Sequence, residues 1–387
     1  MTSSLFTRPF LLLLTQFLAV STVVALFFPL QEYLQHLGVA DSSIGFILGA
    51  DALAALVVQA LITPFVTART ARRWLLGGAM LLGLALLLEG SVTSAALFTA
   101  ARLLQGAGFI GVVAALMPLF VLCIPRDMSG RAFGWISLVR LAPYAAVPPL
   151  FDLLQLSPAA FGSVLQWGSL LAFVVAGLLW MLPVFEQERQ PAVGNSFAGV
   201  RQSLGDATIL LLLAATVLLY AGYAATFFFM KGFAHSHGLT GGGTFFTLAT
   251  LIMMVVRLVG GTWFDRYDKR MLNSLSLFVA AAATVLLAWV GSNSVLLAAA
   301  VLCGLGWGVA MPLLNALLFD RSPPELRGLN QNLSLIMLQA GFFVGPWAGG
   351  ALLATGGYPV LFMGSGSLLL LATLACLLVR EADDRSA

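Results

Sequence analysis

The chain has 387 residues, of which 60% are hydrophobic and 9% are charged, and its net charge is +3. A soluble domain carries about 25% charged residues, so this composition excludes an ordinary soluble enzyme. The few basic residues are dispersed, which argues against nucleic-acid binding. Residues 271–319 and 328–379 contain no charge. Because one spanning helix needs about 20 apolar residues, each stretch predicts two spans joined by a turn.

The hydropathy pattern predicts an all-α integral membrane protein with twelve transmembrane helices. In chain order we expect them at residues 9–35, 43–66, 73–90, 94–121, 130–153, 161–183, 206–232, 241–263, 271–290, 294–319, 328–353 and 358–379. The longest polar stretch, 186–205, is predicted to be a cytoplasmic linker. It would join an N-terminal half, 1–185, to a C-terminal half, 206–387, with six helices in each.

The basic residues predict the orientation of these helices. Lys and Arg in short loops stay in the cytoplasm, and the predicted outer loops contain neither. Both termini are therefore expected in the cytoplasm. The basic residues on the predicted inner side are Arg8, Arg69, Arg72, Arg73, Arg126, Arg131, Arg189, Arg201, Arg266, Lys269, Arg270, Arg321, Arg327, Arg380 and Arg385.

The two halves also repeat each other in sequence, as inverted or parallel transporter repeats do. The segment 64–73 at the end of the second span aligns with 261–270 at the end of the eighth, at an offset of 197 residues. The same offset places Pro148-Pro149 of the fifth span on Gly345-Pro346 of the eleventh. The repeat therefore predicts two pseudo-symmetric six-helix halves.

These segments resemble the signature motifs of the major facilitator superfamily, specifically its bacterial twelve-helix efflux permeases. The loop motif G-x-x-x-D-R-x-G-R-R matches the second-half residues Gly261, Asp265, Arg266, Lys269 and Arg270. The first-half copy retains Arg69, Arg72 and Arg73, but has Pro64 for the glycine and Ala68 for the aspartate. Arg102-Leu-Leu-Gln105-Gly106-Ala-Gly108 resembles the R-x-x-Q-G-x-G motif of the fourth helix. The G-x-x-x-G-P-x-x-G-G motif of proton-driven exporters, expected in the fifth helix, instead occurs at 341–350 in the eleventh.

The resemblance implies a secondary transporter that works by alternating access as the two halves rock about a midplane site. It implies a multi-pass, monomeric protein of the bacterial inner membrane that exports small organic molecules. The sequence has no G-x-x-x-x-G-K-[ST] loop, so an ion gradient, most simply of protons, is the expected energy source. An alternative is a dedicated transporter of one anionic metabolite or metal-chelating small molecule. A different class, a transporter-like sensor or scaffold that does not cycle, is supported only by Ala68.

Ionisable residues inside a span are functional candidates, and three lie well inside the predicted helices. Asp51 of the second span and Arg102 of the fourth lie at similar depths, so we expect a buried pair that protonation of Asp51 could break. A static structural bridge, or a hydrated Asp51, is the alternative. Arg140 of the fifth span either binds an anionic substrate group or pairs with a carboxylate of another helix. Glu32 is a further proton-accepting candidate or a solvated residue, and Glu89 is expected to be solvated.

Polar and aromatic side chains in the spans predict a lining for an amphipathic substrate. The substrate-binding candidates, besides Arg140, are Gln105, Tyr144, Tyr220, Tyr223, Trp307 and Asn315. Gly304, Gly306 and Gly308 predict close helix packing. The three cysteines are isolated and His235-Ser-His237 lacks a third ligand, so we expect no metal site and no cofactor. The predicted spans contain no nucleophile paired with a base, so the sequence does not indicate an enzyme.

Overall fold

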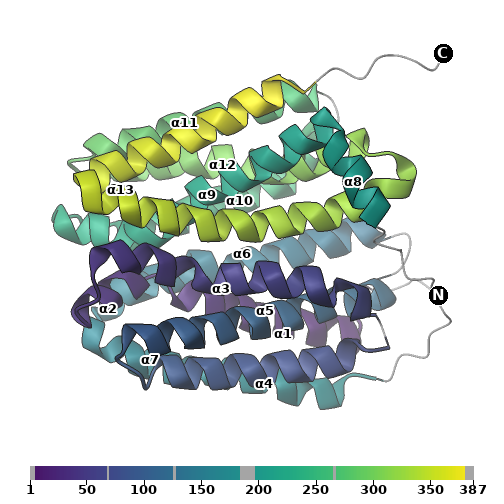
Figure 1. The fold of residues 1–387 in the computed structure, drawn as a ribbon, viewed down its shortest axis with the longest axis horizontal. Helices are drawn as coiled ribbons and strands as arrows, with labels where there is room; N and C mark the ends of the chain where they lie inside the picture. The colour runs from purple at the N-terminus through teal and green to yellow at the C-terminus, as the bar shows by residue number, and fades with distance from the viewer. Residues whose placement is uncertain (1–4, 68, 125–127, 184–196, 265–266, 380–387) are drawn as a thin grey trace. The chain divides into compact units, whose positions relative to one another are not determined.

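The computed structural model describes residues 5–67, 69–124, 128–183, 197–264 and 267–379, and every regular element in these ranges is helical. Figure 1 labels most of the α-helices, which are α1 (Arg8–Leu26), α2 (Leu30–His36), α3 (Asp41–Ile62), α4 (Ala71–Glu89), α5 (Ala95–Cys123), α6 (Ser129–Leu154), α7 (Phe161–Leu178), α8 (Phe197–Gly205), α9 (Ala207–Ser236), α10 (Gly242–Phe264), α11 (Lys269–Leu286), α12 (Asn293–Arg321) and α13 (Arg327–Leu377). Within these described ranges the 3-10 turns are η1 (Thr63–Phe65), η3 (Pro158–Ala160), η4 (Leu179–Met181), η5 (Leu287–Trp289) and η6 (Pro324–Leu326).

The helices follow the predicted spans, with differences at the first span and at the last two. The first predicted span is two helices, α1 and α2, because the chain turns at 27–29, where Pro29 cannot donate a helical hydrogen bond. The last two predicted spans form the continuous element α13, but Gly356 and Gly357 interrupt its helical geometry. Gly357 has a φ of 70°, in the left-handed region that favours glycine. The predicted turn between the two spans is therefore present as a kink.

Ten described segments are long and apolar enough to cross a membrane, and one of them, Pro324–Leu377, contains both of the last predicted spans. The helix α6, which corresponds to the fifth predicted span, is not among the ten. It is less apolar because it holds Arg140 and three prolines. The count of twelve membrane crossings, and their orientation, stay predictions.

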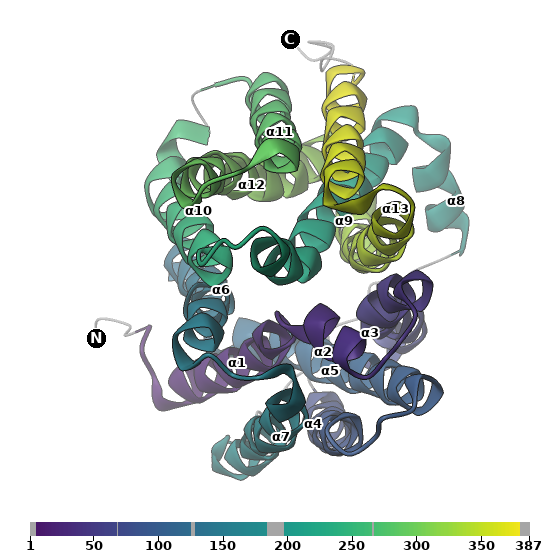
Figure 2. The same cartoon turned by 90° about the vertical axis from the view of Figure 1, so that its left-hand side faces the viewer.

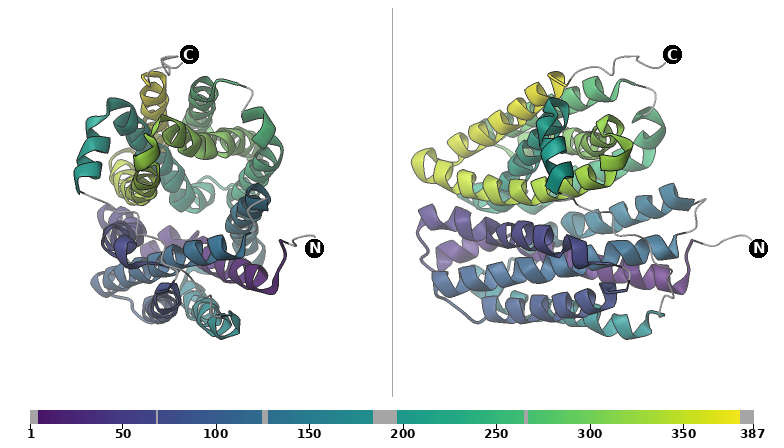
Figure 3. Two further views of the ribbon diagram at one scale, coloured as in Figure 1. Left: turned by 90° about the vertical axis from the view of Figure 1, so that its right-hand side faces the viewer. Right: turned by 45° about the vertical axis from the view of Figure 1, so that its right-hand side comes forward.

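The predicted linker 186–205 is only partly described, because 184–196 lie outside the described residues. Its C-terminal part is the helix α8, which packs against α9 and α13 (Figure 3). The Asp206 side chain then accepts hydrogen bonds from the backbone N–H groups of Thr208 and Ile209, which caps the N-terminus of α9.

The chain forms two compact units. The first consists of Met1–Ala192 with Gly242–Thr247 at the start of α10, and the second of Val193–Gly241 with Leu248–Ala387. In the first unit α4 packs between α5 and α7, α3 packs on α5, and α1 contacts α5, α6 and α7 (Figure 2). A Cβ atom on Gly78 of α4 would lie 2.9 Å from the carbonyl oxygen of Gly108. The backbones of α4 and α5 therefore touch, as small residues allow in membrane helices.

The second unit has the same kind of packing between α13 and α9. The glycines of the G-x-x-x-G-P motif face α9, and a Cβ atom on Gly345 would lie 2.2 Å from the carbonyl oxygen of Ala221. In α12, Gly304 and Gly308 lie against the backbone of α10, and Gly306 lies against that of α11. The predicted packing role of the glycines in α12 is confirmed.

Candidate coupling site in the first unit

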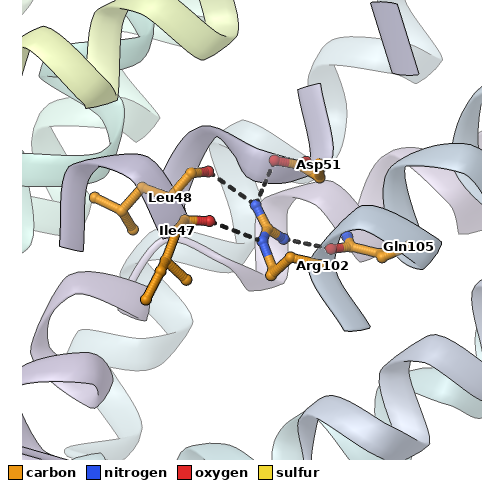
Figure 4. A network of polar contacts seen from close by, with 5 residues as sticks. All are labelled: Ile47, Leu48, Asp51, Arg102 and Gln105. Carbon is orange, nitrogen blue, oxygen red and sulfur yellow. Dashed lines mark hydrogen bonds and ion pairs between the residues drawn. The ribbon is translucent and has the colours of Figure 1, made fainter. Parts of the chain in front are cut away.

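The guanidinium of Arg102 is the centre of a buried polar network between α5 and α3 (Figure 4). Arg102 is fully buried, and its Nη2 atom lies 2.5 Å from Oδ1 of Asp51. Nη2 also donates to the carbonyl oxygen of Leu48 at 2.9 Å, and Nε to that of Ile47 at 3.4 Å. Nη1 donates to Oε1 of Gln105 one turn along α5. The predicted Asp51–Arg102 pair is thus present.

Two further contacts hold this network in place. The Phe27 ring, in the turn between α1 and α2, lies 4.3 Å from the Arg102 guanidinium carbon, a cation–π contact. A Cβ atom on Gly106 would lie only 1.9 Å from the backbone oxygen of Asp51. The backbones of α3 and α5 therefore meet at the level of the ion pair and leave no room for a larger side chain.

The exposures of the two partners differ. The Asp51 side chain is 22% exposed, whereas that of Arg102 is 0% exposed. The carboxylate is therefore the less enclosed partner, while the guanidinium is held by its carbonyl and amide partners. This geometry allows the charge of Asp51 to change while the two helices stay packed.

Arg140 and Tyr144 lie one turn apart on α6. The Tyr144 phenol is close enough to both Arg140 and Asp51 for an electrostatic interaction. Arg140 is exposed and makes no hydrogen bond or ion pair with any residue that the structure describes. Asp152, the acidic residue nearest along α6, instead accepts a hydrogen bond of 2.6 Å from the backbone N–H of Gly243. The predicted alternative of an intramolecular carboxylate partner for Arg140 is therefore not seen in the described part of the chain.

Two further acidic residues of the first unit, Glu32 and Glu89, differ in how deeply they are buried. Glu32 of α2 is half-buried, so its role stays a prediction. Glu89 is 0% exposed, and the prediction that it is solvated was wrong. It ends α4 beside α7, and Gly90 packs so closely on α7 that its Cβ atom would lie 2.4 Å from the Gly162 oxygen. The sequence places Glu89 at a helix end but does not show that another helix covers it.

The aromatic candidates of the second unit form a separate cluster. Tyr223 of α9 contacts the Trp307 ring of α12 edge-on at 4.9 Å, and Phe342 of α13 lies 6.0 Å from Tyr223 and 5.9 Å from Tyr220. Trp307 is fully buried, and the two tyrosines are nearly so. In this structure the cluster holds α9, α12 and α13 together. A substrate-binding role stays a prediction.

Asn315, the last substrate candidate, links α12 to α13. Its Oδ1 atom accepts a hydrogen bond of 3.0 Å from the Ser334 hydroxyl, and its Nδ2 atom donates to the carbonyl oxygen of Met311 at 3.3 Å. Its side chain is thus already occupied by partners within the second unit.

The basic loop residues cap helix ends in both units. Arg72 donates to the carbonyl oxygens of Leu179, Leu182 and Pro183, where α7 and η4 end. Arg270 donates to the carbonyl oxygen of Val379, just beyond α13. Each arginine satisfies carbonyls that a helix end leaves free.

The equivalence of these two arginines corrects the register of the repeat at this point. Arg270 follows Arg72 by 198 residues, one more than the offset of 197, because each is the second residue of its helix.

The remaining loop candidates have varied surroundings. Lys269 forms an ion pair of 2.8 Å with Asp320, and both side chains are partly exposed. Arg73 lines a cavity of about 390 Å³ between α3, α4 and α5. Arg69 is exposed, and Gly261 lies in α10. Asp265 and Arg266 lie outside the described residues. No group of three His, Cys, Asp or Glu residues suited to a metal ion occurs in the described ranges.

Comparison with known proteins identifies the family. The family model described as "Major Facilitator Superfamily" matches residues 10–338 and 291–387. The chain belongs to the major facilitator superfamily. It is therefore a multi-pass integral membrane protein of a family of secondary transporters, and not an enzyme. The alternative of a non-cycling sensor or scaffold stays a prediction.

Individual proteins of this superfamily are more distant. The quinolone resistance protein NorA of Staphylococcus aureus is 28% identical over 152 residues, which are 38% of this chain and 39% of NorA. The match thus spans about two-fifths of the length of that relative.

Solved structures of the superfamily share the fold. A mutant form of the nucleoside transporter NupG has a TM-score of 0.82 at 14% identity, with 97% of this chain and all of that chain covered. The E. coli fucose:proton symporter FucP has a TM-score of 0.63 at 14% identity, with 98% and 100% covered. These likenesses support the arrangement of the helices and carry no information on the substrate.

Proposed function

We propose that this superfamily member is a proton-driven exporter of small organic molecules in the bacterial inner membrane, and that it works as a monomer. The observation that carries the proposal is the Arg102–Asp51 ion pair buried inside the first unit. A charged pair inside a membrane bundle is costly and is commonly found on ion and proton pathways. The carboxylate of this pair is partly exposed, so it is the partner that can exchange a proton.

The geometry favours a coupling mechanism in which the proton and the substrate compete. It disfavours one in which protonation makes the helices slide. Gly106 holds α3 and α5 in backbone contact at Asp51, so protonation changes the charge there without separating the helices. On α6, the Tyr144 phenol lies within electrostatic reach of both Asp51 and Arg140. A proton on Asp51 would make this region more positive and alter its affinity for a bound molecule. Such differential affinity is what couples two ligands in a transporter.

Export of small organic compounds is supported by the similarity to NorA, which is named for quinolone resistance. The exposed Arg140, one turn from the Tyr144 phenol on α6, offers a cation and an aromatic ring side by side. That pair suits an aromatic molecule that carries a carboxylate. A second candidate function, a dedicated transporter of one anionic metabolite, is favoured by the same Arg140.

The test uses purified protein in liposomes with an imposed pH gradient. The probes are a fluorescent quinolone and a lipophilic cationic dye, and accumulation is measured with and without a protonophore. We expect accumulation that the protonophore abolishes, and we expect Asp51→Asn to lose it. Asp320→Asn, which removes a carboxylate from a partly exposed ion pair, is the matched control and should keep it. Gradient-independent movement in the wild type, or an unaffected Asp51→Asn, would refute proton coupling at this site.

The two candidate functions separate by substrate. Accumulation of both the quinolone and the cationic dye indicates a polyspecific exporter. If neither probe moves while a panel of small carboxylates does, in a manner that Arg140→Ala removes, the dedicated anion transporter is the better description.

A further inference from the structure

Glu89 is the most deeply buried carboxyl group of the described chain. It is the last residue of α4, its side chain is 0% exposed, and neither carboxyl oxygen has a hydrogen-bond partner among the described residues. By comparison, the Asp51 carboxylate has the Arg102 guanidinium at 2.5 Å and is partly exposed. These two acidic groups of the first unit therefore lie in opposite environments.

An ionised carboxylate without hydrogen bonds is not stable in such a place. Removing a charge from water is costly unless it is paired and hydrogen-bonded, and the group usually neutralises instead. Glu89 also lies at the C-terminal end of α4, where the helix dipole disfavours a negative charge. Both effects favour the protonated, neutral form in this structure.

The helices packed against α4 do not supply a counter-ion at hydrogen-bonding distance. On α5, the charged residue is Arg102, and it acts on Glu89 through space while its own donors are directed to Asp51, Gln105 and two carbonyls. On α3, Asp51 acts in the opposite sense. The segments α7 and η4 contain no charged or titratable residue.

The amide that lies nearest along α7 has other partners. Gln166 donates to the carbonyl oxygen of Gly90 at 3.2 Å and contacts the Ser91 hydroxyl at 3.1 Å. It therefore holds the chain just after Glu89 against α7, while the carboxyl oxygens of Glu89 have no hydrogen-bond partner among the described residues.

We propose that Glu89 is a second proton-binding site, which holds its proton in the buried state seen here and exchanges it in the opposite sense to Asp51. The part of the proposal that concerns exchange rests on the proposed proton-driven function. When Asp51 is ionised, it neutralises Arg102 and Glu89 keeps its proton. When Asp51 takes up a proton, the charge of Arg102 is no longer balanced, and loss of the proton from Glu89 restores the balance. One proton is bound and one is released, so the net charge of the bundle is unchanged, but the negative charge moves from Asp51 to Glu89 and the surroundings of Asp51 still become more positive.

Infrared spectroscopy of the wild-type protein in lipid, at neutral pH, tests the resting state directly. A protonated carboxyl group gives a carbonyl stretching band that a carboxylate lacks. We expect such a band, and we expect it to shift when the protein is labelled with ¹³C-glutamate but not with ¹³C-aspartate. Glu89→Gln should remove the band, while Glu32→Gln and Asp320→Asn should leave it. The absence of a glutamate band, or its survival in Glu89→Gln, would overturn the proposal.

The coupled part is tested with Asp51→Asn, which fixes a neutral side chain at that position. At neutral pH the carbonyl band of protonated glutamate should then be weaker than in the wild type. As the pH is raised, the band should also disappear at a lower pH than in the wild type. An unchanged band would refute the exchange between the two groups. This readout does not depend on transport, so a missing band with intact proton-driven accumulation refutes the site alone. A normal band without proton-driven accumulation refutes the proposed function alone.

Discussion

A double-mutant cycle on Asp51 and Arg102 measures how strongly the buried pair interacts. Arg102→Met removes the ion pair, the contact with Gln105 and the two carbonyl contacts at once. It also leaves Asp51 without a counter-ion between two packed helices. Breaking a buried pair by removing one partner costs about 3–5 kcal/mol, and we expect a loss in that range.

Asp51→Asn is the milder change, because the amide oxygen can still accept a hydrogen bond from Nη2 of Arg102. A hydrogen bond to a charged group contributes about 1.5–3 kcal/mol, and charge assistance supplies roughly half of its strength. The expected cost is therefore about 1 kcal/mol. The double variant should be more stable than the sum of the two losses predicts, by about 1–3 kcal/mol of coupling energy.

Thermal unfolding in detergent, followed by tryptophan fluorescence, provides the assay. For a folding unit of about 200 residues, 1 kcal/mol corresponds to about 2–4 °C. Arg102→Met should lower the midpoint by about 6–20 °C, and Asp51→Asn by a few degrees. Acid protonates Asp51 and so removes the negative charge that Asp51→Asn also lacks. The unfolding midpoints of the wild type and of Asp51→Asn should therefore converge as the pH falls. Additive losses, within about 0.5 kcal/mol, would refute the energetic coupling that the geometry implies.

Further variants test three separate parts of the structure. Arg140→Ala should fold normally, since Arg140 has no described hydrogen bond or ion pair, and should raise the KM for carboxylate substrates while leaving cationic dyes unaffected. Arg72→Gln loses contacts with three carbonyl oxygens, whereas Arg270→Gln loses the contact with the Val379 carbonyl; at about 1 kcal/mol per lost carbonyl contact, Arg72→Gln should lower the melting midpoint more, and equal losses would contradict this account of the caps. Gly345→Val should cost about 1–3 kcal/mol or more by overpacking against α9, whereas Gly177→Ala, with open space around it, should be neutral.

The membrane character and most helices could be predicted because long uncharged stretches leave few alternatives. The exceptions have local causes. Phe27, Phe28 and Pro29 are as apolar as their neighbours, so hydropathy continues through the turn that separates α1 from α2. The helix α8 lies in the linker, where a short polar segment gives a weak signal. The kink at Gly356–Gly357 was predictable because a run of small residues precedes Pro359.

The site could be predicted only in part. The sequence gives the depth of a residue along its helix, but it does not give the groups on other helices that the side chain contacts. The helical rise placed Asp51 and Arg102 at one level, and the structure joins them. The carbonyls of Ile47 and Leu48 carry no sequence signal, since every residue has one. Glu89 was misjudged for a related reason: its neighbours along the chain form a polar turn, whereas α7, on which Gly90 packs, begins more than 70 residues later.

The distribution of carboxyl groups between the two halves restricts where proton coupling can occur. The helices α9, α10, α11 and α13 contain no Asp or Glu, and the acidic residue of α12, Asp320, lies at its end in an exposed pair with Lys269. The first unit holds Asp51 and Glu89. If protons drive the cycle through membrane carboxylates, the first half must bind them. The second half then contributes close helix packing and aromatic surface, so the pseudo-symmetric fold carries an asymmetric division of chemistry.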